Sequence, residues 1–149
     1  MIDVSGFQSA GVALGEDEKD TEQLRAQFED AQAYIKGFSW SEPIERAYLA
    51  FGVGGIFALF LFVFEKAVGG TDKELWVVTG DLPSAYFITD AAEMVPDAID
   101  TYCCLMEEWI VSVEEDDHEI KVFPIAAQRT KANADALRTR IAFLRKNFL

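Results

Sequence analysis

The segment that most constrains this chain is an uncharged stretch from Ala47 to Phe64. Its 18 residues reach the lower limit for a helix that crosses a membrane. Three glycines interrupt it, within Gly52–Gly55, and glycine weakens a helix and favours a turn. We therefore divide the stretch at these glycines and predict two shorter elements in a soluble protein. A single-pass membrane helix over residues 47–64 stays as the alternative.

The two halves of this stretch predict different elements. In the first half the apolar side chains Ile44, Ala47, Tyr48 and Phe51 share one face at helical spacing, with Ser41 as the N-cap. This half therefore predicts a short helix that stops at Gly52. The second half, Ile56–Phe64, holds nine apolar residues and is too short to span a membrane as a helix. It predicts a strand buried on both faces.

Three further segments have apolar residues at helical spacing. Leu24, Phe28, Ala31 and Ile35 predict an amphipathic helix over residues 20–36 that packs on the core. A second helix is expected over 96–113, and a third from about Arg129, whose basic residues would dock on the acidic remainder of the chain.

Strand signals lie on both sides of the turn Gly80–Ser84. Leu75–Thr79 and Ala85–Thr89 are rich in β-branched and aromatic residues, so they predict a meander with the Phe-rich strand. Alternation over Glu119–Phe123 predicts a fourth strand that pairs with the Phe-rich strand. The expected fold class is α+β, with an antiparallel sheet of three to four strands packed by about four helices. Residues 1–149 form one domain in this prediction, with residues 1–15 as a flexible or loosely docked arm.

Charge is distributed very unevenly along the chain. Residues 1–128 hold 25 acidic and 7 basic side chains, a net charge of −18, whereas Arg129–Leu149 carry a net charge of +5. The total of −13 repels nucleic acid and anionic lipid and attracts basic proteins. The sequence therefore predicts a basic protein partner and excludes nucleic acid and membrane surfaces as partners. The N-terminal residues lack the basic start and apolar run of a secretory signal, so the expected location is the cytoplasm.

The candidate partner-binding residues form an acidic run after the second predicted helix. They are Glu114, Glu115, Asp116, Asp117 and His118. Carboxylates with an imidazole also suit a divalent metal, but consecutive loop residues seldom converge and the chain has no second histidine. We predict a solvated acidic loop or a partner surface here, and no metal site.

No motif for catalysis or cofactor binding is present. The glycine pairs lack the lysine and helix start of a phosphate loop, and the adjacent Cys103 and Cys104 predict neither a disulfide nor a redox pair. We therefore predict no catalytic, metal or cofactor residue. The enzyme alternative is a hydrolase or metal-dependent enzyme that uses scattered carboxylates such as Asp81, Glu107 and Glu108.

The segment Leu75–Tyr86, with Trp76-Val77-Val78 ahead of Gly80-Asp81-Leu82-Pro83-Ser84, resembles a hairpin of a family of small uncharacterised bacterial proteins. The resemblance extends to the helix with Tyr102, Met106 and Trp109. It implies a bacterial α+β domain and brings no known activity or site residue with it. Together with the charge, it favours a non-enzymatic acidic module, of the inhibitor or immunity type, that binds a basic protein. The aromatic content and the doubly apolar strand also allow a homodimer.

Overall fold

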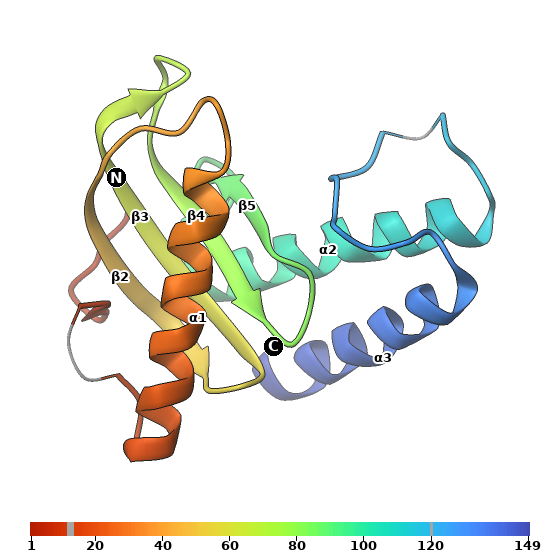
Figure 1. Cartoon of the computed structure of the whole chain (residues 1–149), viewed down its shortest axis with the longest axis horizontal. Coiled ribbons are helices and arrows are strands. Elements are labelled where there is room, and N and C mark those ends of the chain that lie inside the picture. The colour runs from red at the N-terminus through yellow and green to blue at the C-terminus, as the bar shows by residue number, and fades with distance from the viewer. Residues whose placement is uncertain (12–13, 120) are drawn as a thin grey trace. The chain divides into compact units, whose positions relative to one another are not determined.

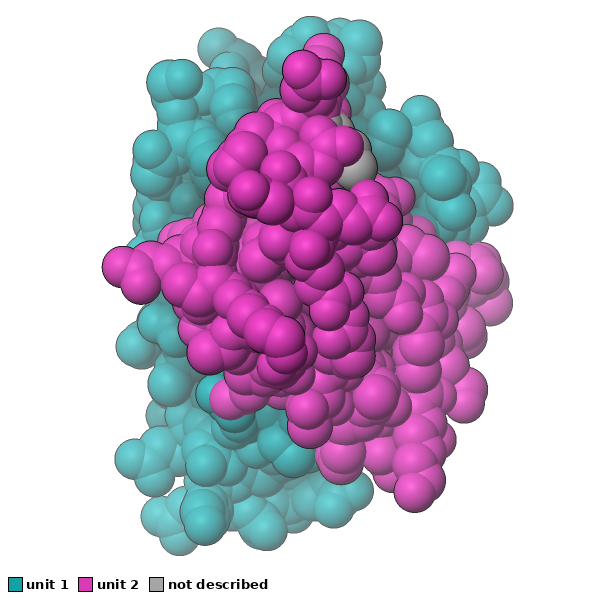
Figure 2. Space-filling view, turned by 90° about the vertical axis from the view of Figure 1, so that its right-hand side faces the viewer, with its two compact units in different colours: residues 1–93 teal, residues 94–149 magenta. Residues whose placement is uncertain are grey.

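A computed structural model describes residues 1–11, 14–119 and 121–149 (Figure 1). They divide into two compact units, Met1–Glu93 and Met94–Leu149, which Figure 2 colours separately. Unit 1 holds an antiparallel sheet and one helix, and unit 2 holds two helices. The predicted α+β class with an antiparallel sheet is confirmed. The elements of unit 1 are β1 (Gln8–Ser9), α1 (Glu18–Lys36), β2 (Ile44–Val53), β3 (Phe57–Val68), β4 (Asp72–Gly80) and β5 (Ala85–Ile88).

The sheet of unit 1 is a meander in the order β1-β2-β3-β4-β5, with every neighbouring pair antiparallel. Its central strand β3 pairs with β2 and with β4, and its first eight residues, Phe57–Phe64, are buried. The predicted strand with two apolar faces is therefore confirmed. Burial on both sides removes the aggregation risk that such a strand would carry at a sheet edge.

One face of the sheet packs against α1, which crosses it in Figure 1. The buried face of α1 contributes Leu24, Ala31 and Ile35, and β3 contributes Phe60 and Phe62, which contact the ring of Phe28. The helix is fixed at its start by Asp17, which is the N-cap and accepts a hydrogen bond from the Asp20 amide at 2.8 Å. The predicted amphipathic helix over residues 20–36 is confirmed.

The other face of the sheet centres on Trp76, which is fully buried. Its indole Nε1 donates a hydrogen bond to the Ala92 carbonyl at 2.7 Å, and the ring of Phe7 meets it edge-on. Phe7 belongs to the predicted N-terminal arm. Ile2, Ala10 and Leu14 of this arm are buried, so its described parts contribute to the core.

The predicted short helix before Gly52 is wrong, since these residues form β2. Two irregularities in the β2–β3 register, between Ile44 and Arg46 and between Leu49 and Phe51, disturb the simple alternation of side chains. As a result Ile44, Ala47 and Leu49 all belong to the cluster packed with α1. Of the four residues whose spacing predicted a helix, only Ile44 and Ala47 join this cluster, so the helical pattern did not mark the face that packs on α1.

The predicted fourth strand over Glu119–Phe123 is also wrong. Ile120 lies outside the described residues, and its described neighbours form no strand. β2 takes the place beside β3 that this segment was expected to fill, because a tight turn at residues 54–56 joins the two strands directly. The described residues thus form five strands and three helices, in place of three to four strands and about four helices.

Unit 2 is a pair of helices, α2 (Val95–Glu114) and α3 (Lys131–Phe148), that confirms the two predicted C-terminal helices. Both apolar stripes are largely buried: Ile99, Tyr102, Cys103, Met106, Trp109 and Ile110 on α2, and Leu137, Ile141 and Leu144 on α3. Arg145 of α3 bonds Asp100 at 2.8 Å and Glu107 at 2.6 Å on α2. These contacts raise the pKa of Arg145, chiefly through Glu107.

No helix in the described ranges is long and apolar enough to cross a membrane. The uncharged stretch that raised this alternative lies in β2, its following turn and β3.

Candidate functional site

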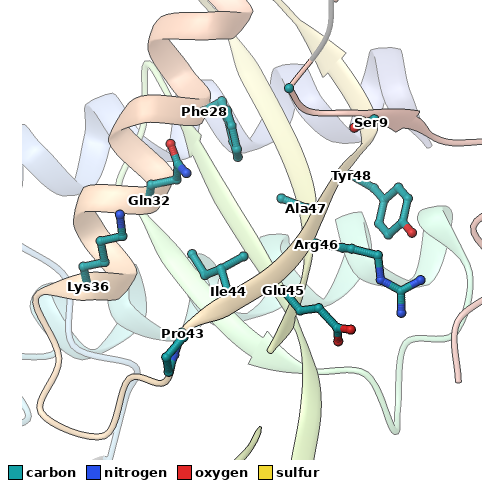
Figure 3. A pocket seen from close by; sticks show the side chains of 11 residues that line it. Ser9, Phe28, Gln32, Lys36, Pro43, Ile44, Glu45, Arg46, Ala47 and Tyr48 are labelled. Atoms are coloured by element: carbon teal, nitrogen blue, oxygen red, sulfur yellow. The ribbon is translucent and has the colours of Figure 1, made fainter. Parts of the chain in front are cut away.

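A groove in unit 1 lies between α1 and the outer edge of β2 (Figure 3). Its volume is about 720 Å³, and Phe28, Gln32 and Lys36 extend into it from α1. Ile44 and Ala47 form the wall on the strand side. No sequence pattern predicts this groove, because it depends on how α1 packs beside β2.

The acidic run predicted to bind a partner folds back over the C-terminus of α2. Amide groups of Glu115, Asp116 and Asp117 donate hydrogen bonds to carbonyl groups of the last turn of α2, at 2.9–3.1 Å. Asp116 takes a positive φ of 49°, as a residue that ends a helix often does. These bonds satisfy carbonyl groups that a helix end leaves open. They offset the cost of placing carboxylates near the negative end of the helix dipole.

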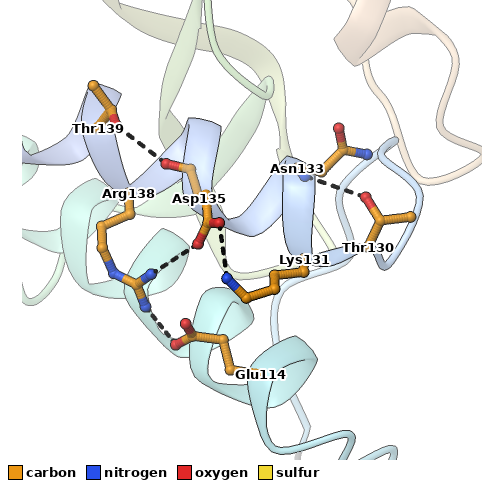
Figure 4. A network of polar contacts seen from close by, with 7 residues as sticks. All are labelled: Glu114, Thr130, Lys131, Asn133, Asp135, Arg138 and Thr139. Carbon is orange, nitrogen blue, oxygen red and sulfur yellow. Dashed lines mark hydrogen bonds and ion pairs between the residues drawn. The ribbon is translucent and has the colours of Figure 1, made fainter.

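The side chains of this run point to different partners. Glu114 forms an ion pair with Arg138 of α3, which also contacts Asp135 (Figure 4). Asp116 lies 3.1 Å from the His118 ring, and Asp117 accepts a hydrogen bond from the Glu119 amide at 2.9 Å. Across the described part of the chain, no group of three or more His, Cys, Asp or Glu side chains is arranged to hold a metal ion. The run is thus an exposed acidic surface in which Glu114 is already paired.

The acidic excess of the protein lies mainly in unit 1. This unit holds 16 acidic and 6 basic side chains, a net charge of −10, against −3 for unit 2 with 10 acidic and 7 basic side chains. Within the described residues, none of the six basic side chains of unit 1 takes part in an ion pair. In unit 2, by contrast, Lys131, Arg138 and Arg145 form ion pairs with carboxylates of the same unit, some of which Figure 4 shows.

Part of the excess in unit 1 is concentrated on the outward face of α1. Glu18, Glu22 and Glu29 are exposed there, and the helical repeat of about 100° per residue places them within roughly 40° of each other. The opposite face of the helix is committed to the core through Leu24 and Ile35. We call these three glutamates the α1 acidic face, although the exposed Arg25 lies on the same stripe between Glu22 and Glu29 and reduces its net charge to −2. Because these glutamates are not consecutive, a run of acids in the sequence does not reveal them, and only their spacing on the helix brings them together.

The carboxylates at the start of α1 have structural roles. Asp20 accepts hydrogen bonds from the Gly54 amide at 2.7 Å and the Glu16 amide at 3.0 Å, which fixes α1 to the turn between β2 and β3. Asp20 also lines a cavity of about 570 Å³ with Glu16 and Asp17. Both Asp17 and Asp20 therefore act as backbone acceptors.

Of the three carboxylates named for the enzyme alternative, two lie on α2 and one follows β4. Glu107 pairs with Arg145, and Glu108 is exposed on the same helix. Asp81 follows β4 in unit 1, and its amide donates a hydrogen bond to the Ile56 carbonyl at 3.0 Å.

The two cysteines differ in environment. Cys103 is buried, and burial raises the pKa of its thiol to about 11, an effect that Arg145 partly offsets. Cys104 is exposed, with its Sγ 3.6 Å from Arg145 Nη2.

We expect only Cys104 to react quickly with a thiol reagent at pH 8, because the thiolate is the reactive species and Cys103 stays protonated until the pH nears 11. The measurement is the number of thiols labelled in the native protein by an aromatic disulfide reagent. Cys104→Ser should abolish the fast phase and Cys103→Ser should keep it. A fast phase of two thiols would contradict this description of Cys103.

No protein-family model, curated protein or solved structure shows significant similarity to this chain.

Proposed function

We propose that this chain is a non-enzymatic, acidic interaction module that binds a basic protein, in the manner of an inhibitor or immunity protein that masks a cationic partner. The observation that carries the proposal is the net charge of −10 on unit 1, whose basic side chains form no ion pair within the described residues. An excess of carboxylates creates a negative potential that steers and orients a basic partner.

Two surfaces are available to such a partner. The α1 acidic face offers three exposed carboxylates on a rigid helix, and a site on a helix is held more precisely than a site on a loop. The second surface is the run Glu114–His118. Arg138 already neutralises Glu114, and His118 lies beside Asp116. We therefore assign the larger share of binding to the α1 acidic face and a smaller share to the run.

The proposal places the protein in the bacterial cytoplasm. Both cysteines are free in the structure, as expected in a reducing compartment.

The test begins with capture of the partner on immobilised full-length protein at 50 mM NaCl, elution with salt and identification by mass spectrometry. Binding of the purified partner is then compared between wild type and two variants that each lose three negative charges. One variant is E18Q/E22Q/E29Q, and the other is E115Q/D116N/D117N. Glutamine keeps nearly the helix propensity of glutamate, so α1 should stay folded.

We expect the first variant to bind roughly tenfold more weakly, because three exposed charges contribute about 0.2–1 kcal/mol each. The affinity of the second variant should fall about threefold or less, because a loop is held less precisely than a helix and His118 lies beside Asp116. If both variants bind the captured partner as tightly as wild type does, the acidic surfaces do not mediate recognition and the proposal fails. A captured partner that is itself acidic would also overturn it.

A further inference from the structure

Four aromatic side chains gather at one corner of unit 1. They are Tyr34 of α1, Phe38 and Trp40 of the segment between α1 and β2, and Tyr86 of β5. Phe38 stacks on Trp40, with ring centroids 4.9 Å apart and 16° between the ring planes. The Tyr86 ring lies 4.9 Å from Trp40 and 5.1 Å from Phe38. We call these four residues the aromatic cluster.

The aromatic cluster is half-buried and held in place. Tyr34, Trp40 and Tyr86 pack against the core between α1 and the sheet, and all four side chains keep part of their surface exposed. The Ser41 amide donates a hydrogen bond to the Phe38 carbonyl at 3.1 Å, which closes the turn that carries Phe38 and Trp40. Tryptophan and tyrosine side chains fixed in this way are enriched among the residues that dominate binding in protein interfaces.

Two carboxylates flank the aromatic cluster. Asp30 precedes Tyr34 by one helical turn and therefore lies on the same side of α1. Glu42 follows Trp40 by two residues. Neither carboxylate forms an ion pair within the described part of the chain.

The basic side chains of this region do not neutralise these carboxylates. Lys36 lies about 160° around α1 from Tyr34 by the helical repeat, and it extends into the groove beside β2 (Figure 3). Lys73 lies four residues along β4 from Val77, which pairs with Tyr86, a distance of about 13 Å. Among the described residues, neither lysine forms an ion pair. The aromatic cluster is therefore a site that favours a cation.

Aromatic rings beside carboxylates favour a guanidinium over an ammonium group. A cation within about 6 Å of a ring centroid is attracted to the negative face of the ring, most strongly for tryptophan. The planar guanidinium also stacks flat on an aromatic ring and can bond one carboxylate through two parallel hydrogen bonds. A lysine ammonium carries the same charge but offers neither of these contacts.

We propose that the aromatic cluster binds an arginine side chain of the basic partner, with the guanidinium stacked on the exposed aromatic surface and paired with Asp30 or Glu42. This inference rests on the proposed function, because it assigns the basic partner an anchoring residue. The anchor lies on a different side of α1 from the α1 acidic face, so the two sites can be altered separately.

The probes are two acetylated and amidated hexapeptides of equal charge, one with three glycine–arginine repeats and one with three glycine–lysine repeats. Each is titrated into nitrogen-15-labelled full-length protein at 50 mM NaCl, and NMR follows the indole N–H signals. Trp76 and Trp109 are buried, so their signals serve as internal controls for Trp40. We expect a saturable shift of the Trp40 signal and roughly threefold tighter binding of the arginine peptide than of the lysine peptide.

Two variants test the two halves of the site, with folding checked by circular dichroism. Trp40→Leu keeps an apolar side chain, and it should weaken the arginine peptide roughly threefold and the lysine peptide less. The double variant D30N/E42Q should also weaken the arginine peptide roughly threefold. Its matched control is E18Q/E22Q, which removes the same charge from the α1 acidic face and should change binding less than about twofold.

The inference is overturned if the arginine peptide leaves the Trp40 signal unchanged at millimolar concentration. It is also overturned if both peptides bind equally well and Trp40→Leu binds them as tightly as wild type does, because only net charge then matters. Failure of the proposed function has a different signature. In that case the captured partner binds without the acidic surfaces, while the arginine peptide still shifts Trp40 and supports the anchor.

Discussion

Replacing Trp76 by alanine should lower the free energy of unfolding by about 3–5 kcal/mol, the range for removal of a large buried aromatic side chain. Trp76 is fully buried, with a relative accessibility of 0%. Its indole Nε1 donates a hydrogen bond to the Ala92 carbonyl at 2.7 Å. The measurement is urea denaturation followed by circular dichroism.

The variant Trp76→Phe separates packing from hydrogen bonding at this position. It keeps an aromatic ring but leaves the buried Ala92 carbonyl without its donor. Its free energy of unfolding should therefore fall by about 1–3 kcal/mol, which is less than the fall in the alanine variant. A loss below about 1 kcal/mol for Trp76→Ala would show that this face of the sheet is not a packed core.

Replacing Gly80 by alanine should cost about 2–4 kcal/mol, for steric reasons that concern the backbone. A Cβ atom at Gly80 would lie 2.3 Å from the Ile56 carbonyl oxygen, and the φ angle of +147° is one that side-chain-bearing residues rarely adopt. Ile56 cannot simply move aside, because its carbonyl accepts the Asp81 amide and the next residue, Phe57, pairs with Gly80.

Gly6→Ala is the matched control for Gly80, since an added Cβ there meets no atom within 4 Å. It should change the free energy of unfolding by less than about 0.5 kcal/mol in the same denaturation experiment. Equal effects of the two substitutions would contradict the close approach of Gly80 to Ile56.

Strong periodicity made most of the fold predictable from the sequence. Leu24, Ala31 and Ile35 repeat at helical spacing on one face of α1, and the uninterrupted apolar run of β3 leaves no alternative to burial on both faces. β2 was not predictable in this way. Register irregularities at Ile44/Arg46 and Leu49/Phe51 break the simple alternation that marks a strand, and pairing with β3 decides the outcome.

The candidate binding surfaces were less accessible from the sequence than the fold. Total charge is a property of composition, but whether a carboxylate is neutralised depends on tertiary contacts such as Arg138 with Glu114 and Arg145 with Glu107. The groove beside β2 depends on how α1 packs next to this strand. Sequence periodicity carries no information about the space left between two packed elements.

The most direct measurement of the central claim is the dissociation constant of the purified partner at 50 and at 200 mM NaCl. If carboxylates of unit 1 mediate recognition, binding should weaken by roughly tenfold or more over this range, since screening acts strongly on exposed charges. A dissociation constant that changes less than about twofold would mean that recognition is not electrostatic. The acidic surface would then serve solubility alone.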